Sequence, residues 1–251
     1  MKVGKVVGTG NTASVYDWEE GKVLKLFKQG YPEEAVENEY HNAIAIRAMS
    51  FLKPKAYEMI SYEDRKGIIY DRVEGESLFD WVIKTNDLQG CAIQMANLHK
   101  AIGQNIISNV PNYKDFLRRH ISNALLTTDE QLEVTQRIDK LPDGDTLCHG
   151  DFHPGNILVS GGSAYVIDFM NICHGDFLYD IARTVYLVEF TPVASGVSDY
   201  EKEMMLFFKR SLTELYLEQM NVTREMLQEY LSVIRVMRKG ECPNEGVGGI
   251  E

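Results

Sequence analysis

The chain has 251 residues, of which 44% are hydrophobic and 25% are charged, as in an ordinary globular protein with a sizeable core. Its formal net charge of −11 argues against a surface that follows nucleic-acid phosphates. The sequence begins without the apolar run of a signal peptide and holds no long apolar segment, so we expect a cytoplasmic protein that binds neither nucleic acid nor membrane.

The acidic excess is uneven along the chain. Residues 1–74 hold 11 Lys and Arg against 12 Asp and Glu, whereas residues 75–251 hold 15 against 25. Such an acidic second part would suit a cationic small molecule, although the excess acid equally serves solubility. The four cysteines are scattered, without a C-x-x-C pair, which favours reduced thiols over a disulfide framework or a zinc site.

The first 75 residues read mostly as strands. "KVVGTG" and "ASVYDW" flank a Gly-rich turn, "KVLKLF" follows Gly21, and "GIIYDRVEG" comes later, with one helix predicted from Pro32 in "PEEAVENEYHNAIAIRAM". After Gly75 the pattern changes to long helices, expected around 91–103 and at 113–126, 129–140, 176–190, 199–219 and 223–239, with short strands near 146–148, 157–159 and 164–167. We therefore predict an α+β protein with a β-rich N-terminal lobe, 1–74, and a helical C-terminal lobe, 75–251. A crevice between such lobes is a common ligand site.

A Gly-rich turn and a strand lysine are the first candidate functional features. The turn "GTGNTASVY" would let backbone N–H groups approach an anion, although Gly-rich hairpin turns are also common for steric reasons alone. Lys25 lies between apolar Leu24 and Leu26, so it is expected on the opposite face of its strand, where it could hold phosphate oxygens. Glu37 and Glu39 on the following helix are candidates to orient this lysine, and the longer separation favours Glu39.

Three polar residues flank two short strands later in the chain. Asp151 and Asn156 stand five positions apart in "CHGDFHPGNILV", ahead of an apolar strand, and Asp168 follows the next strand, "YVIDF". A carboxylate can orient an attacking hydroxyl and accept its proton, and amide and carboxylate oxygens are ligands for Mg²⁺. Each acid alone would pass for a turn residue. Together with the turn, the lysine and the glutamate, they make the set of parts used in kinase-type phosphoryl transfer.

These motifs resemble those of the aminoglycoside phosphotransferase/choline kinase family, a branch of the protein-kinase-like fold. "HGDFHPGNIL" is similar to the family's H-G-D-x-H-x-x-N catalytic loop, "VIDF" to its I-D-[WF] metal motif and "GDFLYDIART" to the G-[DN]-x-x-x-D-[LI]-A segment that follows. The resemblance covers about residues 4–190. Two positions depart from the protein-kinase pattern, because Ala13 and Met170 stand where glycines are found.

The resemblance implies a role for each matching position. Asp151 is the implied catalytic base, Asn156 and Asp168 are implied Mg²⁺ ligands, and Lys25 would contact the phosphates of ATP while paired with Glu39. The implied nucleotide contacts further include the backbone of Asp71 and Val73 at the adenine and, over the phosphates, Gly8, Thr9, Gly10, Asn11 and Thr12.

We therefore predict an ATP- and Mg²⁺-dependent transfer of a phosphoryl group to a hydroxyl of a small molecule that is aminoglycoside-, choline- or sugar-like. One alternative is a compact atypical protein kinase. Against it, Gly150 stands where many protein kinases have an arginine, and the span from Asp168 to Asp176 leaves no room for a full activation segment. The other alternative is a nucleotide-binding module without catalysis, which would be expected to lack one of the polar residues named above.

Overall fold

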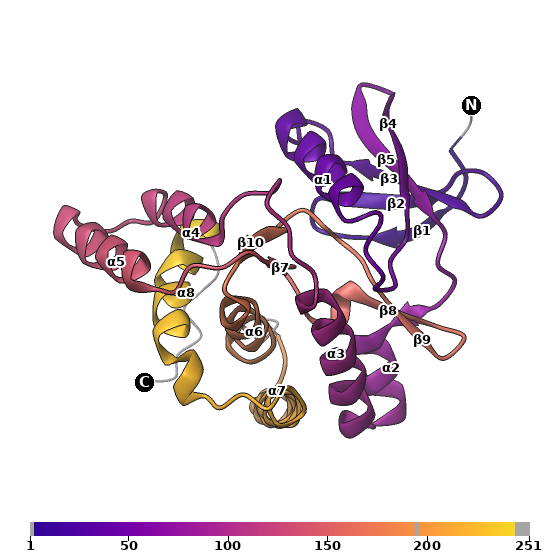
Figure 1. Ribbon diagram of the computed structural model, residues 1–251. Coiled ribbons are helices and arrows are strands. Elements are labelled where there is room, and N and C mark those ends of the chain that lie inside the picture. The colour runs from indigo at the N-terminus through magenta and orange to yellow at the C-terminus, as the bar shows by residue number, and fades with distance from the viewer. Residues whose placement is uncertain (1–2, 194–195, 244–251) are drawn as a thin grey trace.

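The computed structural model describes residues 3–193 and 196–243, and it begins with a five-stranded antiparallel sheet (Figure 1). The strand order is β1-β2-β3-β5-β4. The strands are β1 (Val6–Thr9), β2 (Ala13–Asp17), β3 (Lys22–Phe27), β4 (Ala56–Tyr62) and β5 (Arg65–Asp71). Helix α1 (Glu33–Ala45) connects β3 to β4 and packs against β4 and β5.

The two faces of this sheet have different neighbours. Leu24 and Leu26 on β3 are fully buried, together with Ile69 of β5, in a small apolar cluster. Because side chains alternate along a strand, Lys25 points to the opposite face, as the sequence predicts. The sheet therefore positions a lysine toward α1.

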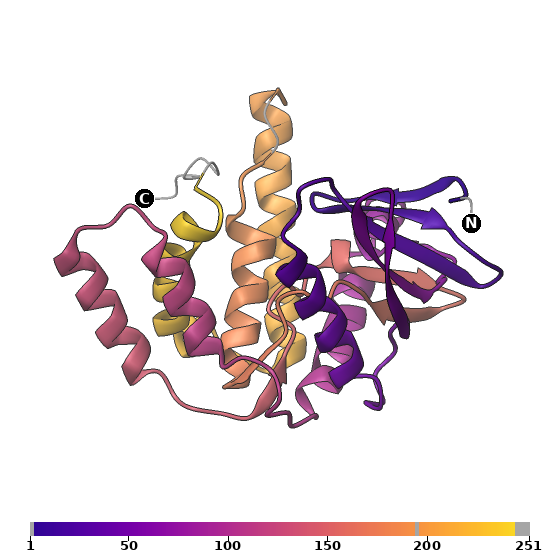
Figure 2. The same ribbon diagram turned by 90° about the horizontal axis from the view of Figure 1, so that it is seen from above.

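The second part of the chain is mainly helical (Figure 2). Its helices are α2 (Leu78–Thr85), α3 (Leu88–Gly103), α4 (Tyr113–Ser122), α5 (Thr128–Lys140), α6 (Phe177–Val185), α7 (Asp199–Met220) and α8 (Gln228–Glu241). A π-helical segment, Tyr186–Phe190, continues α6, and short 3-10 turns cover Pro154–Asn156 and Glu225–Leu227. Helix α7 packs on α3, and α4, α5 and α8 lie on the side away from the five-stranded sheet (Figures 1 and 2).

Two small sheets are inserted among these helices. β6 (Glu76–Ser77), β8 (Ile157–Ser160) and β9 (Ser163–Val166) form one, and β7 (Thr146–Cys148) pairs with β10 (Cys173–Gly175) in the other. β8 and β9 form a hairpin that turns at Gly161 and Gly162, which both have positive φ. This hairpin carries Asn156 at its start and leads into Asp168 at its end.

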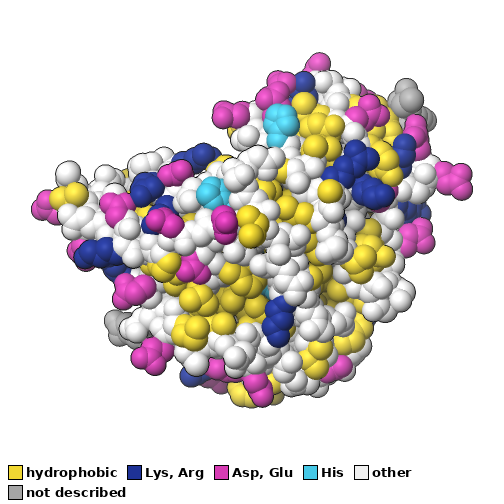
Figure 3. Space-filling view, viewed as in Figure 1, with side chains coloured by type: hydrophobic (Ala, Val, Ile, Leu, Met, Phe, Trp, Pro, Cys, Tyr) yellow, Lys and Arg dark blue, Asp and Glu magenta, His cyan; other side chains and the backbone are white. Residues whose placement is uncertain are grey.

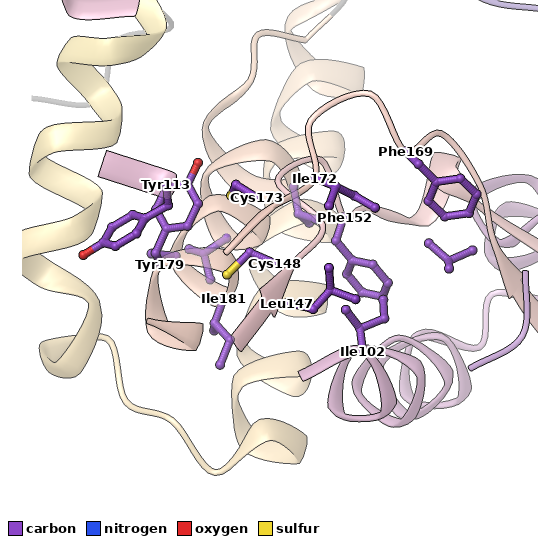
Figure 4. Close-up of a cluster of buried hydrophobic side chains, with 14 of the residues drawn as sticks. Ile102, Tyr113, Leu147, Cys148, Phe152, Phe169, Ile172, Cys173, Tyr179 and Ile181 are labelled. Carbon is purple, nitrogen blue, oxygen red and sulfur yellow. The ribbon is translucent and has the colours of Figure 1, made fainter. Parts of the chain in front are cut away.

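A continuous apolar core packs against the loops that carry Asp151 and Asp168. In Figure 4, Leu147 and Cys148 of β7 lie among side chains from α3, α6 and β10. Phe152 and Phe169 join the same core, with exposed fractions of 0% and 1%. Because each of these aromatic rings directly follows a candidate site aspartate, their burial fixes the backbone at Asp151 and Asp168.

The structure confirms the predicted α+β, kinase-like architecture with a sheet followed by helices. Strands β4, β6 and β10 and helix α2 were not predicted, and α1 ends at Ala45, a few residues before the predicted end. The division into lobes at residue 74 stays a prediction; the chain leaves the large sheet at Asp71 and enters β6 at Glu76.

The surface and the helices bear on the expected partners. On the face shown in Figure 3, basic and acidic side chains are interspersed among the described residues. Within 3–193 and 196–243, no helix combines the length and the apolar character needed to cross a membrane.

Candidate active site

The β8–β9 hairpin brings two of the predicted site residues together. Ile157 pairs with Val166 in its register, and the Ile167 N–H donates to the Asn156 carbonyl at 3.0 Å. Asn156 and Asp168 are therefore held at the same end of the hairpin. Asp168 has a φ of 68°, a conformation that aspartate adopts more readily than most non-glycine residues.

Lys25 joins the large sheet, α1 and this hairpin in one ionic cluster. Its Nζ lies 2.7 Å from Glu39 Oε1 and 3.2 Å from Asp168 Oδ1. The side chain of Glu39 is 1% exposed and that of Lys25 is 14% exposed. Of the two glutamates considered from the sequence, Glu39 makes this contact. Asp168, the other partner of Lys25, lies 143 positions after the lysine in the chain.

Charge and burial oppose each other in this cluster. Burial would lower the pKa of Lys25, but Glu39 and Asp168 outweigh it and raise that pKa, so the lysine stays charged. Burial raises the pKa of Glu39 although Lys25 works against it. Burial would also raise the pKa of Asp168, yet Lys25 reverses the effect and holds it below its ordinary value. The cluster therefore keeps the Lys25 cation and the Asp168 carboxylate ionised beside the buried Glu39.

Two further residues support the cluster, and the sequence reasoning missed both. The Tyr70 hydroxyl donates to Glu39 Oε1 at 3.1 Å. Asn42, one turn after Glu39 on α1, donates from Nδ2 to the Phe169 carbonyl at 2.9 Å. The three-residue spacing of Glu39 and Asn42 on one helix face is the signal that would have found Asn42.

Asp151 is oriented by its neighbours in the loop before β8. Asn156 Nδ2 donates to the Asp151 carbonyl at 2.9 Å and to Asp151 Oδ2 at 3.0 Å. His153 Nε2 lies 4.0 Å from the same Oδ2. The Asp151 side chain remains 27% exposed, so its carboxylate is held in one direction and is still reachable from solvent.

The backbone before Asp151 is held by a buried carboxylate of α6. Asp180 accepts hydrogen bonds from the His149 N–H at 2.6 Å and the Gly150 N–H at 2.8 Å. His99 of α3 contacts the oxygen that accepts from His149, with Nε2 2.9 Å from Asp180 Oδ2. Burial would raise the pKa of Asp180, but His99 outweighs burial and lowers it. Asp180 is thus an ionised anchor for the loop.

His149 is packed beneath the loop. It is buried, its Nδ1 accepts from the Asp151 N–H at 3.3 Å, and its Nε2 lies 3.2 Å from the Ile167 carbonyl. These partners place the proton of the neutral ring on Nε2. Burial lowers the pKa of His149, so the ring serves as a neutral hydrogen-bonded bridge between the two loops.

Gly150 is required by both its conformation and its surroundings. Its φ is +74°, and an added Cβ would lie 2.2 Å from the Asn171 carbonyl oxygen. We expect Gly150→Ala to lower the free energy of unfolding by clearly more than the roughly 1–3 kcal/mol of a strained backbone conformation, because a backbone atom must also move. Urea unfolding of the purified variant measures this difference.

Gly161→Ala is the matched control for that substitution. Gly161 also has positive φ, +56°, but no atom lies within 4 Å of its added Cβ. The expectation for Gly150 is contradicted if the two variants lose the same free energy of unfolding.

The Gly-rich turn and the segment after β5 lie at the ends of sheet strands. Gly8 and Thr9 lie on β1, and Gly10, Asn11 and Thr12 form the turn, closed by a 2.8 Å hydrogen bond from the Gly10 N–H to the Ala13 carbonyl. Ala13 is buried in β2, which explains why a small side chain rather than glycine is accepted there.

The predicted adenine contacts follow β5. The Asp71 N–H already donates to the Lys55 carbonyl at 3.0 Å, so a purine would meet the carbonyl of Asp71 rather than its N–H. Val73 comes two residues later, between the sheet and β6.

The donor set near Asp168 suits a hard divalent cation that brings ligands of its own. In the described part of the chain, no three His, Cys, Asp or Glu side chains are arranged to hold a metal. Asn156 donates from Nδ2 to Asp151, and Asp168 accepts from Lys25 at Oδ1. Among the residues that the structure describes, Asn156 Oδ1 and Asp168 Oδ2 have no such partner and are available to a cation. Two such oxygens are what Mg²⁺ takes from a protein when phosphates complete its shell.

The fold and this set of residues define a kinase-like protein. The chain superimposes on a thermostable mutant of aminoglycoside phosphotransferase APH(4)-Ia with a TM-score of 0.63 and 16% identity, over 97% of this chain and 89% of that one. It matches the amicoumacin kinase hAmiN, solved with AMP-PNP, Ca²⁺ and Ami, with a TM-score of 0.62 and 15% identity, over 95% and 80%. It also matches APH(3'')-Id from Streptomyces rimosus with a TM-score of 0.61 and 14% identity, over 93% and 92%.

A sequence model of a protein family also matches the chain. The model of the phosphotransferase enzyme family, APH, matches residues 4–203, and the chain belongs to this family. The predicted family and enzyme class, a phosphotransferase, are thereby confirmed. No curated protein matches the chain in sequence.

Proposed function

We propose that this phosphotransferase moves the γ-phosphoryl group of ATP to a hydroxyl group of a small molecule. The observation that carries the proposal is the bridge from Lys25 to both Glu39 and Asp168, next to a loop in which Asn156 orients Asp151. Phosphoryl transfer depends mainly on positioning and charge neutralisation around the phosphates, which this arrangement supplies.

Asp151 is the proposed base. Its carboxylate is partly exposed and fixed by Asn156, so it can accept a hydrogen bond from the acceptor hydroxyl and take its proton during transfer. His149 and Asp180 hold the backbone on which this carboxylate is mounted.

Asn156 and Asp168 are the proposed Mg²⁺ ligands. A bound Mg²⁺ neutralises the charge that develops on the phosphate oxygens. Lys25 is held by Glu39 at the position from which its ammonium can contact the same phosphates. The turn Gly8–Thr12 and the backbone of Asp71 and Val73 are proposed to cover the phosphates and to meet the adenine, which puts the nucleotide between the parts 1–74 and 75–251.

The acceptor is proposed to be a hydroxylated small molecule of the aminoglycoside, choline or sugar kind. Structural relatives were solved with hygromycin B and with streptomycin, which are such molecules, and hAmiN was solved with Ami. The acidic excess of residues 75–251 supports an acceptor that carries positive charge.

The atypical protein kinase is the less supported alternative. The segment between Asp168 and Asp176 is short, and its last part, Cys173–Gly175, forms β10 and pairs with β7 directly before α6 begins. A Cβ at position 150 would lie 2.2 Å from the Asn171 carbonyl oxygen, so this position does not accept the arginine that pairs with a phosphorylated activation segment in many protein kinases.

Binding of a non-hydrolysable ATP analogue at two Mg²⁺ concentrations tests the proposed metal site. We expect Asp168→Asn to weaken Mg²⁺-dependent binding by at least about tenfold at low Mg²⁺ and to recover partly when Mg²⁺ is raised, because a charged oxygen ligand is lost. Isothermal titration calorimetry gives both values.

Asp64→Asn is a matched control, since Asp64 also has positive φ, 59°, but lies in the turn between β4 and β5. Unchanged Mg²⁺ dependence in Asp168→Asn, equal to that of the control, would remove Asp168 from the metal site.

A further inference from the structure

Arg183 of α6 is a fully buried cation that none of the proposed roles uses. Its side chain is 0% exposed, and its Nε donates to the carbonyl of Gly150 at 3.0 Å. Gly150 directly precedes Asp151 in the chain. Within the described residues, this is the only hydrogen bond from the guanidinium to the catalytic loop. Its acceptor is the carbonyl of the peptide group that joins Gly150 to Asp151, the proposed base.

Arg183 and Asp180 lie on one face of α6 and both form hydrogen bonds with Gly150. Asp180 accepts from the Gly150 N–H at 2.8 Å, and Arg183, three residues later on α6, donates to the Gly150 carbonyl. Residues three apart lie on the same side of a helix, so a negative and a positive side chain meet the donor and the acceptor of one glycine. The Gly150 carbonyl belongs to the peptide group that joins Gly150 to Asp151, and the N–H of the same group donates to His149 Nδ1 at 3.3 Å. Both polar atoms of the peptide that leads into Asp151 are therefore held.

A buried guanidinium needs a compensating charge, and the end of α8 supplies it. Glu241 Oε1 lies 2.5 Å from Arg183 Nη2, and Glu241 Oε2 lies 2.8 Å from Arg238 Nη1. Burial would raise the pKa of Glu241, but the two arginines outweigh it and lower that pKa to about 2. Glu241 is thus ionised at neutral pH and joins the last described helix to the loop through Arg183.

We propose that Arg183 is a positioning residue for Asp151 and that Glu241 holds Arg183 in its working orientation. The proposal rests on the proposed function, because it assigns the pair to the loop that carries the base. Glu241 lies 90 positions after Asp151, so the end of α8 takes part in shaping the catalytic loop although it is distant in sequence.

Two variants separate positioning from mere stability. In Glu241→Gln the arginine remains buried without its carboxylate, and we expect a lower melting temperature together with a kcat reduced by roughly 10- to 100-fold, the loss that a small displacement of a catalytic group can cause. In the double variant Arg183→Met/Glu241→Gln the fully buried cation is removed together with its carboxylate, and only Arg238 loses a contact, so the melting temperature recovers in large part. Its kcat is expected to stay low, because the hydrogen bond to Gly150 is absent, while the KM for ATP stays within about twofold of the wild type.

Hydrogen exchange of the backbone amides at 149–151 provides a readout that does not depend on turnover. We expect faster exchange there in both variants. Asp143→Asn is the control, because Asp143 pairs at 2.6 Å with another cation of low exposure, Lys114, whose side chain is 9% exposed. That control should leave exchange at 149–151 and kcat unchanged.

The possible outcomes distinguish this proposal from the function on which it rests. A double variant that regains wild-type kcat along with its stability overturns the positioning role, as does unchanged exchange at 149–151 in both variants. If the wild-type protein transfers no phosphoryl group while exchange changes as expected, the proposed function is wrong. The contacts of Asp180 and Arg183 with Gly150 then have only a structural role.

Discussion

Asp151→Asn is expected to lower kcat by about 10²- to 10⁴-fold, the usual contribution of a general base. Asparagine has the size of aspartate and can still accept the hydrogen bond from Asn156 Nδ2, so the loop keeps its geometry. The charge and the basicity are lost. Nucleotide affinity should change little, because the carboxylate acts on the acceptor hydroxyl rather than on ATP. Steady-state kinetics together with nucleotide binding separate these two quantities.

Asp145→Asn is the control for that substitution. Asp145 is exposed and lies six residues upstream, just before β7, so losing its charge should leave kcat unchanged. If Asp151→Asn keeps more than about a tenth of the wild-type kcat, Asp151 is not the base, because the loss of activity is then smaller than the roughly 100-fold minimum expected for removing a general base.

Lys25→Met is expected to abolish productive nucleotide binding and to destabilise the fold. It leaves Glu39, which is 1% exposed, without its cation and next to Asp168, and removing one partner of a buried pair typically costs about 3–5 kcal/mol. Because Glu39 can then take up a proton, the loss should be smaller at acidic pH than at neutral pH. Urea unfolding at both pH values measures the free energy of unfolding.

A second substitution separates the two effects of Lys25. In Lys25→Met/Glu39→Leu no buried carboxylate is left unpaired, so stability should return while binding of Mg·ATP stays weak. Lys22→Met, on the same strand but in an exposed pair with Glu19, is the control. Wild-type nucleotide affinity in Lys25→Met would show that Lys25 does not contact the phosphates.

The parts of the site that could be predicted from sequence are those that local patterns determine. The alternation Leu24-Lys25-Leu26 places the lysine on the face opposite the leucines, and the two short strands after Asn156 pair as a hairpin that ends at Asp168. The longer separation from Lys25 favours Glu39 over Glu37, and Glu39 is the glutamate that contacts Lys25.

The supports of the site could not be predicted, because they join segments that are distant in sequence. Tyr70 contacts Glu39 only once β5 lies beside β3, and Arg183 reaches Glu241 only because α6 packs on α8. Strands β6 and β10 have two and three residues, too few to show a period, and they form because partner strands β8 and β7 lie beside them. Neither tertiary contacts nor pairing with a partner strand produces a periodic pattern of residues in the sequence.

A product-resolved assay with Mg·ATP and a panel of hydroxylated amines, sugars and nucleosides tests whether this protein transfers a phosphoryl group to a small molecule. ADP and free phosphate are measured separately, and the acceptors are examined by mass spectrometry. We predict that ADP exceeds free phosphate with at least one acceptor, that this acceptor gains one phosphoryl group, and that Asp151→Asn suppresses the gain. Equal amounts of ADP and phosphate with every acceptor, at a rate that Asp151→Asn leaves unchanged, would contradict this prediction.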